Sequence, residues 1–331
     1  MNRRINWLLI LQGWAMLWVV IGHSGPSASL DDYPAYAAYI RDVAYSFHMY
    51  LFVTISGFLF FLTRLDNKRW TYWDVMKDKL VRFGIPFVVF TVVALVLKSV
   101  FAGSVDRATT LSIKEFVNAI VYPYNGPMRE FWFLATIMWY FAFYPLWRIV
   151  LKNQLLSALL LIGLAIVGIW PPSSDLLAIR HVCQYAFFFY AGILCANKYK
   201  DNETFVAQRS FIVIAYIAGS ILYIMGRFFP IPLIAPIGGI VLSLAICLSL
   251  DKMRSKAFCS FRNYTYQIYL LGIYFNVMII ILRAKFGLPF TPMYVISLFL
   301  GLYMPVLISK FLEWVNWESM LLCVGLKKKN N

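Results

Sequence analysis

The stretch that decides the fold is INWLLILQGWAMLWVVIGH, residues 5–23, which contains no Asp, Glu, Lys or Arg. A helix of about 20 apolar residues crosses the ~30 Å hydrocarbon core of a bilayer, so this stretch is long enough to span a membrane. Arg3 and Arg4 precede it, as basic residues do in a signal peptide, but no small-residue cleavage site follows. We therefore interpret it as a retained first membrane span.

Similar apolar runs recur along the whole chain, in which 61% of the 331 residues are hydrophobic and 14% are charged. Strands of a membrane barrel would alternate polar and apolar residues, whereas these runs are continuous and indicate helices. The expected fold class is all-α, a polytopic membrane helix bundle of about ten transmembrane helices. The spans lie roughly at residues 5–23, 46–63, 83–103, 131–150, 154–171, 181–197, 210–228, 232–250, 264–283 and 288–310.

The distribution of positive charge predicts how the bundle is oriented in a cell membrane. A net charge of +15 is also typical of nucleic-acid binding, but the basic residues stand in short clusters between apolar runs. If the N-terminus is cytoplasmic, about two thirds of the 30 Lys and Arg residues fall on the inner side. Both termini are therefore expected in the cytoplasm, and nucleic acid is not expected as a partner.

The loops between the spans are too short to fold as separate domains, since the longest cover about residues 24–45, 64–82 and 104–130. We expect a single integral-membrane domain over residues 1–331, so that function resides in the bundle and in these loops. The five cysteines show no CxxC or His-Cys spacing, and no metal site is expected.

Two histidines mark the predicted outer boundary, His23 at the end of the first span and His48 at the start of the second. Gln12 lies eleven residues before His23, about three helical turns, so both share a face that should point into the bundle. Two imidazoles near carboxylates would provide a base and its orienting partner. The alternative is that His23 is an ordinary interfacial residue, because helix ends tolerate polar groups. The loop between the histidines carries three carboxylates, Asp31, Asp32 and Asp42.

Polar residues at two further places have both a functional and a structural interpretation. Ser56, in the sequence Ile55-Ser56-Gly57-Phe58, either contacts substrate or belongs to a small pair that lets helices pack closely. No Gly-x-Ser-x-Gly motif surrounds it to favour a nucleophile. Lys79 and Arg82 precede the third span on the inner side, where they either follow the positive-inside pattern or clamp a phosphorylated donor.

The outer start of the fourth span carries an acidic and an aromatic candidate. Glu130 either neutralises the adjacent Arg129 or orients one of the histidines. Trp132 is either an ordinary interface aromatic or a ring on which a sugar would stack. We carry Glu130 as a catalytic candidate and Trp132, with Ser56, as a candidate for substrate binding.

Four blocks in order along the chain carry a resemblance to a known family. They are LQGWAMLWVVIGHS at residues 11–24, YSFHMYLFVTISGFLF at 45–60, the stretch 79–86 with its basic Lys79 and Arg82 together with the aromatic stretch 131–146, and residues 264–271. In these blocks the sequence resembles the acyltransferase 3 family of membrane-bound O-acyltransferases, over nearly the whole chain. The resemblance implies a ten-helix bundle that moves acyl groups, commonly acetyl from acetyl-CoA, to sugars or other extracytoplasmic acceptors.

The resemblance also implies roles for particular residues. The family's essential histidine falls on His23, which would act as general base, and His48 matches a subset of the family. The family's companion arginine is replaced by Gln12, which can hydrogen-bond a carbonyl but carries no charge. Another family histidine falls on Gly272. Together with Lys79 and Arg82, Gln12 is our candidate for donor binding.

The expected function is an O-acetyltransferase that acts on a glycan or lipid-linked sugar, with acetyl-CoA as donor and no permanently bound cofactor. Membrane lipids are the other expected partners, and homo-oligomer formation is left open. One rival is a transporter or flippase in which His23, His48 and Glu130 form a proton relay. The other rival is a catalytically inactive relative, which the substitutions at Gln12 and Gly272 favour.

Overall fold

The computed structural model describes residues 5–25, 34–67, 69–101, 109–206, 208–229 and 231–326. The structure is 83% helical, and no strand is present in the described ranges. Among the described residues, eight helices are long and apolar enough to cross a membrane, and a ninth is counted if one bent pair forms a single span. The prediction of an all-α polytopic membrane bundle is therefore confirmed.

Each predicted span overlaps a helix, but two of them differ from a straight crossing. The fourth is broken into α7 (Trp132–Ala142) and α8 (Tyr144–Val150), which are bent by 51°. Pro145 lies at the start of α8, where its missing N–H and fixed φ favour a new helix over continuation of the old one. The fifth is α9 (Gln154–Ile169), a shorter apolar helix of 16 residues.

The three longest predicted loops contain helices of their own. They are α2 (Ala35–Tyr45), α4 (Tyr72–Lys79) and α6 (Ile113–Val121). Side-chain caps explain two of these starts, since Thr71 accepts from the Asp74 N–H in a capping box and Ser112 accepts from the Glu115 N–H. Each of the three stretches between predicted spans therefore contains a short helix that the hydropathy pattern did not predict.

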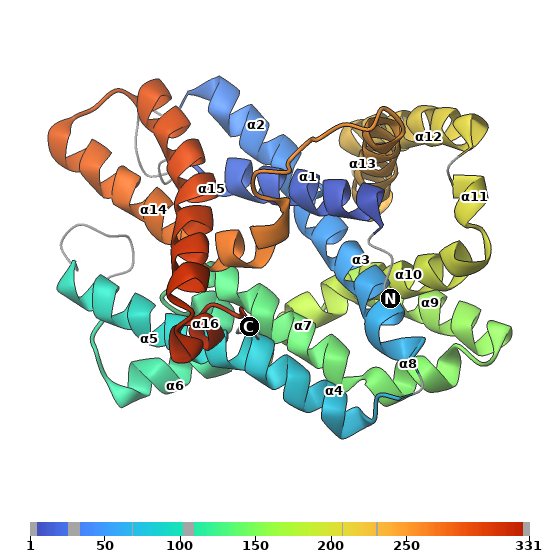
Figure 1. Ribbon diagram of the computed structural model, residues 1–331, viewed down its shortest axis with the longest axis horizontal. Helices are drawn as coiled ribbons and strands as arrows, with labels where there is room; N and C mark the ends of the chain where they lie inside the picture. Colours follow the sequence, from blue (N-terminus) through green and yellow to red (C-terminus); the bar gives the residue numbers. More distant parts are fainter. Residues whose placement is uncertain are drawn as a thin grey trace. The chain divides into compact units, whose positions relative to one another are not determined.

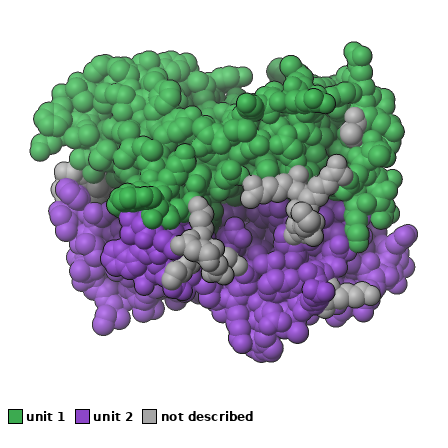
Figure 2. All heavy atoms as spheres, viewed as in Figure 1, with its two compact units in different colours: residues 1–55, 198–314 green, residues 56–197, 315–331 purple. Residues whose placement is uncertain are grey.

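The chain forms two compact units, shown in different colours in Figure 2. Unit 1 comprises residues 1–55 and 198–314, and unit 2 comprises residues 56–197 and 315–331. The single domain over residues 1–331 stays a prediction. Unit 1 holds α1 (Asn6–His23), α2, the first part of α3 (His48–Phe60), α11 (Glu203–Val206), α12 (Arg209–Phe228), α13 (Ile234–Lys252), α14 (Thr265–Phe286) and most of α15 (Phe290–Val315). Unit 2 holds the rest of α3, α4, α5 (Ile85–Val100), α6 to α9, most of α10 (Ile179–Asp201) and α16 (Glu318–Cys323).

Within unit 1, helix α1 packs against α2, α13 and α14, and α12 lies beside α13 (Figure 1). Small residues permit these close approaches, as in other membrane bundles. A Cβ atom added to Gly219 of α12 would lie 2.6 Å from the backbone nitrogen of Leu242 in α13. Across the α1–α13 contact, Trp14 Nε1 donates a hydrogen bond of 3.0 Å to Ser243 Oγ.

Unit 2 is built around an aromatic core. The rings of Tyr140 and Phe189 stack with centroids 4.6 Å apart, and those of Trp147 and Tyr190 stack at 5.4 Å. The polar atoms of these rings are paired, because Tyr140 Oη donates to the Val182 carbonyl at 2.8 Å and Trp147 Nε1 donates to the Tyr140 carbonyl at 2.7 Å. Buried aromatic residues of this kind fix the helices of unit 2 against one another.

Candidate active site

His23 is the last residue of α1 and is half-buried. Its Nδ1 atom lies 3.3 Å from the hydroxyl of Tyr45, the last residue of α2. Gly22 makes this approach feasible, since a Cβ there would already lie 3.2 Å from the Tyr45 ring. A helix that the sequence did not predict thus brings a hydroxyl against the candidate base.

His48 begins α3 directly after a turn and is fully buried, with 0% of its surface exposed. Its Nδ1 atom lies 2.6 Å from the Ala44 carbonyl oxygen. A carbonyl only accepts hydrogen bonds, so Nδ1 carries the hydrogen and the Nε2 of a neutral ring presents a lone pair. Nε2 is buried and has no hydrogen-bond partner in the described part of the chain.

The two histidines and Tyr45 form one cluster in unit 1, which we call the His23 cluster. The ring centroids of His23 and His48 are 6.0 Å apart, and Tyr45 lies 5.6 Å from His23 and 5.1 Å from His48. The structure therefore brings together the two imidazoles that the sequence singled out. Their catalytic roles stay predictions.

Side chains of α14 and α15 hold the end of α1 that carries this cluster. Asn276 Nδ2 donates to the His23 carbonyl at 3.3 Å, and Ser297 Oγ donates to Asn276 Oδ1 at 3.0 Å. Tyr294 Oη donates to the Ile21 carbonyl at 3.5 Å. The last carbonyls of a helix lack partners within the helix, and these groups supply them. Sequence analysis missed Asn276, although an amide inside an apolar run is a recognisable signal.

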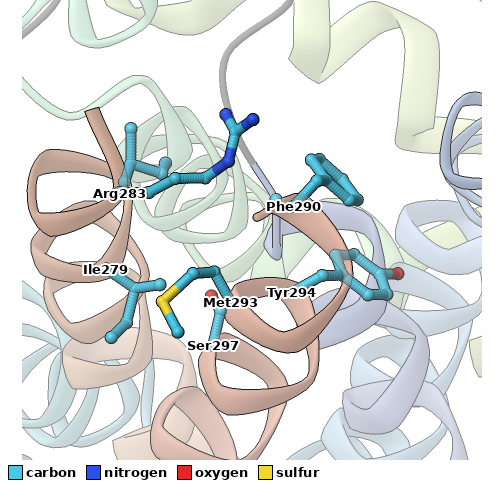
Figure 3. A pocket seen from close by; sticks show the side chains of 8 residues that line it. Ile279, Arg283, Phe290, Met293, Tyr294 and Ser297 are labelled. Carbon is cyan, nitrogen blue, oxygen red and sulfur yellow. The ribbon is translucent and has the colours of Figure 1, made fainter. Parts of the chain in front are cut away.

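A small cavity of about 10 Å³ adjoins the end of α1, with Gly25, Arg283, Tyr294 and Ser297 among its lining residues. Figure 3 shows Arg283 on α14 opposite Phe290 and Tyr294 on α15. Arg283 is only 6% exposed, and its guanidinium lies 5.4 Å from the Phe290 ring centroid. This space is about the size of one water molecule.

The carboxylates expected around the histidines are accounted for only in part. Asp42 forms an ion pair with Arg227, which ties α2 to α12 instead of meeting a histidine. Asp31 and Asp32 lie outside the described residues. Gln12 is half-buried on α1, and helical spacing puts it about 16 Å before His23 along the axis.

The other predicted site residues, Ser56, Lys79, Arg82, Glu130 and Trp132, belong to unit 2. Trp132 stacks on His181 at 4.3 Å and on Tyr185 at 5.1 Å, so its ring is engaged within unit 2. Glu130 is half-buried in a single 3-10 turn, η4 (Arg129–Phe131). Neither arrangement tests the predicted roles in catalysis or sugar binding.

The Ser56-Gly57 pair lies at a tight helix crossing. A Cβ added to Gly57 would fall on the carbonyl oxygen of Phe189 in α10. Gly57 is therefore needed for close packing of α3 on α10, as the structural interpretation of this pair expected. The substrate contact proposed for Ser56 stays a prediction.

The two predicted donor-binding cations face different surroundings. Lys79 is buried, with Nζ 4.6 Å from the Phe141 ring centroid and 3.9 Å from Asp78 Oδ2. Arg82 is exposed and lines a groove of about 270 Å³ together with Lys77. Of the predicted pair, Arg82 is thus the one directed at an open site.

The apolar helices make this chain an integral, multi-pass membrane protein. A family model described as an acyltransferase domain matches residues 5–310. The chain belongs to this family, acyltransferase 3, and the resemblance seen in the sequence is confirmed. No curated protein and no solved structure matches the chain.

Proposed function

We propose that this membrane acyltransferase moves an acetyl group from acetyl-CoA to a hydroxyl of an extracytoplasmic glycan or lipid-linked sugar. The observation that carries the proposal is the His23 cluster, in which a half-buried imidazole contacts a hydroxyl beside a second, buried imidazole. An oriented imidazole at a helix end is suited to accept a proton from an acceptor hydroxyl. The family membership supplies the acyl-transfer chemistry.

In the proposed reaction His23 takes the proton of the acceptor hydroxyl, and the oxygen attacks the thioester carbonyl. The tetrahedral intermediate collapses, the carbon–sulfur bond breaks, and the CoA thiolate leaves with the proton that His23 has held. Since Nδ1 of His23 faces the Tyr45 hydroxyl, we assign the proton transfer to Nε2. Tyr45 then acts as a positioning residue that fixes the imidazole ring.

Gln12 is assigned to the donor rather than to the reacting carbonyl. It lies about 16 Å from His23 along α1, too far for both to contact one carbonyl group. The pantetheine arm of CoA is long and carries amide groups, which a neutral glutamine can hydrogen-bond. This assignment gives the uncharged residue a role that requires no charge.

The test uses purified protein in nanodiscs with radiolabelled acetyl-CoA and extracted surface glycans. His23→Ala is expected to lower transfer by about 10²- to 10⁴-fold, the usual contribution of a general base. It should still bind acetyl-CoA and keep the elution profile and melting temperature of the wild type. Undiminished transfer by a folded His23→Ala protein would refute the assigned base.

The same experiment separates the rival functions. If the wild type neither binds nor consumes acetyl-CoA, a transporter or flippase and an inactive relative take precedence. Uptake of a lipid-linked sugar in proteoliposomes would then distinguish these two. Donor consumption without any transfer to a glycan would keep the enzyme and reject the proposed acceptor.

A further inference from the structure

Helix α2 presents a row of aromatic and charged side chains beside the His23 cluster. Tyr39, Asp42 and Tyr45 are spaced three residues apart, so they are neighbours along one side of the helix. Tyr39 is 66% exposed and Tyr45 is 49% exposed. Together with Arg227 of α12, which forms an ion pair with Asp42, we call this row the α2 face. From Tyr45 to Tyr39 it extends about 9 Å along the helix axis.

The ion pair indicates that the α2 face lies outside the hydrocarbon core. The side chain of Asp42 is 59% exposed and that of Arg227 is 33% exposed. Charged groups that face lipid chains are costly, so a helix side that carries this pair is expected to meet water. The exposed tyrosine rings of the same row are therefore accessible to a water-soluble molecule.

Contacts at both ends of α2 hold the face in place. Near its start, Tyr36 Oη lies 2.7 Å from Thr291 Oγ1 of α15. Directly after its end, Ser46 Oγ lies 3.0 Å from Tyr223 Oη of α12. A surface that is already ordered loses little conformational entropy when a ligand binds to it. The α2 face is thus a preformed surface rather than a loop that must fold around its ligand.

The chemistry of the α2 face suits an uncharged sugar chain. A tyrosine ring offers an apolar surface to the C–H groups of a sugar. Asp42 and Arg227 can hydrogen-bond sugar hydroxyls, because a carboxylate and a guanidinium have more hydrogen-bonding positions than their mutual bond uses. Arg227 also interacts electrostatically with Tyr39, which places the charged pair beside the ring. Since the two charges cancel, the face matches neutral hydroxyls better than a phosphate.

Tyr45 connects this face to the candidate base. Its hydroxyl lies 3.3 Å from His23 Nδ1, while its ring continues the row of Asp42 and Tyr39. We propose that the α2 face binds the sugar units next to the acetylated one, with a ring stacked on Tyr39 and its hydroxyls bonded to Asp42 and Arg227. The inference rests on the proposed transfer to a glycan. It adds that the acceptor is an uncharged chain of sugars bound along α2, not a single sugar.

The first test compares two acceptors in nanodiscs with radiolabelled acetyl-CoA. One is the extracted surface glycan, and the other is glycerol, which is too short to extend from His23 to Tyr39; acetyl-CoA hydrolysis replaces glycerol as the reference if glycerol is not acetylated. Tyr39→Ala should lower the ratio of kcat/KM for the glycan to that for the reference about tenfold, the loss expected for one stacking contact. Tyr39→Phe keeps the ring and should keep the wild-type ratio. Tyr122→Ala is the matched control, since Tyr122 is an exposed tyrosine of unit 2.

The second test measures glycan binding without turnover, by surface plasmon resonance on the His23→Ala protein. In this background Asp42→Asn and Arg227→Gln should each weaken binding of the extracted glycan about tenfold, the usual effect of one hydrogen bond to a charged group. Arg209→Gln is the control, because Arg209 is an exposed arginine at the opposite end of α12. Equal affinities of Arg227→Gln and Arg209→Gln would overturn the assignment of the ion pair.

The outcomes separate this inference from the proposed function. If the wild type acetylates the glycan and Tyr39→Ala keeps the ratio of Tyr122→Ala, only the α2 face fails. If the wild type neither acetylates nor binds the glycan, both fail. An equal loss for both acceptors would show that Tyr39 acts through the His23 cluster and would overturn the binding role. A loss with a lipid-linked glycan that disappears once the lipid is cleaved off would show that the face holds lipid, and would also overturn it.

Discussion

Replacing Gly272 by alanine tests whether the crossing of α14 and α15 supports the His23 cluster. A Cβ at this position would lie 2.6 Å from the carbonyl oxygen of Gly301. Carbon–oxygen contacts usually start near 3.3 Å, so the two helices would have to separate by about 0.7 Å. One turn further along α14, Asn276 accepts from Ser297 of α15 across the same interface.

The magnitude follows from these contacts. The Ser297–Asn276 hydrogen bond of 3.0 Å would stretch beyond a useful length, at a cost of about 1 kcal/mol. Overpacking of the crossing costs about 1–3 kcal/mol, and the higher helix propensity of alanine returns up to about 1 kcal/mol. We expect Gly272→Ala to lower the free energy of unfolding by about 1–3 kcal/mol.

The matched control is Gly163→Ala, because a Cβ at Gly163 of α9 meets no atom within 4 Å. This change should leave stability unchanged or raise it by up to about 1 kcal/mol. Unfolding of both variants in mixed detergent micelles measures the difference, and acetyl transfer by the folded fraction measures the effect on His23. Equal unfolding midpoints for the two variants would refute the argument from the crossing.

Three further substitutions test individual contacts. Tyr45→Phe removes the hydroxyl that lies 3.3 Å from His23 Nδ1. The transfer rate should fall about tenfold, while the free energy of unfolding changes by less than about 0.5 kcal/mol. An unchanged transfer rate would exclude Tyr45 as a positioning residue. His48→Asn keeps a donor for the backbone carbonyl but removes Nε2 and leaves a cavity at a fully buried position, so the free energy of unfolding should fall by about 1–3 kcal/mol and the folded protein should transfer more slowly. A wild-type transfer rate per folded molecule would show that Nε2 has no role. Arg64→Met leaves Asp78 without the guanidinium that donates to it at 2.6 Å. The free energy of unfolding, measured by denaturation, should fall by about 1–3 kcal/mol, and the KM for acetyl-CoA should rise. A wild-type KM would argue against phosphate binding beside Asp78.

The helices of the bundle could be predicted because a bilayer leaves few alternatives for a continuous apolar run. The break before Pro145 was missed, since the run of apolar residues continues across it and hydropathy carries no information on direction. Helix α2 was missed because its sequence is amphipathic rather than apolar. Its buried residues Ala37 and Ala44 are seven apart and lie on one face, which is a signal that periodicity could have given.

Only those residues of the candidate site could be predicted whose polar side chains are energetically costly in an apolar span. His23 and His48 stand out because imidazoles at or within apolar spans are expensive. Tyr45 and Asn276 act through contacts with residues distant in the sequence, and no local pattern encodes these contacts. The same holds for the groove of Lys77 and Arg82, which residues of the C-terminal segment also line.

Gly272, at the position of a family histidine, lies where α14 and α15 of unit 1 cross closely. Where the resemblance implies a histidine, the carbonyl of Gly301 occupies the space that a Cβ would need. No imidazole fits at Gly272 while α14 and α15 cross at this point. Asn276, one turn further on, contacts the His23 carbonyl instead, and His48 contributes a second imidazole from α3.

Gln12 stands where the resemblance implies an arginine, so the chain lacks a positive charge at this position. A glutamine cannot replace an arginine in binding phosphate, because it offers hydrogen bonds without a charge. If acetyl-CoA is the donor, its phosphates must be recognised by cations elsewhere in the chain. The groove lined by Lys77 and Arg82 carries such cations, and Asp78, the one carboxylate among its described lining residues, is paired with Arg64. Gln12→Arg should therefore leave the phosphate dependence of donor binding unchanged, and a variant whose binding no longer depends on Arg82 would contradict this division of roles.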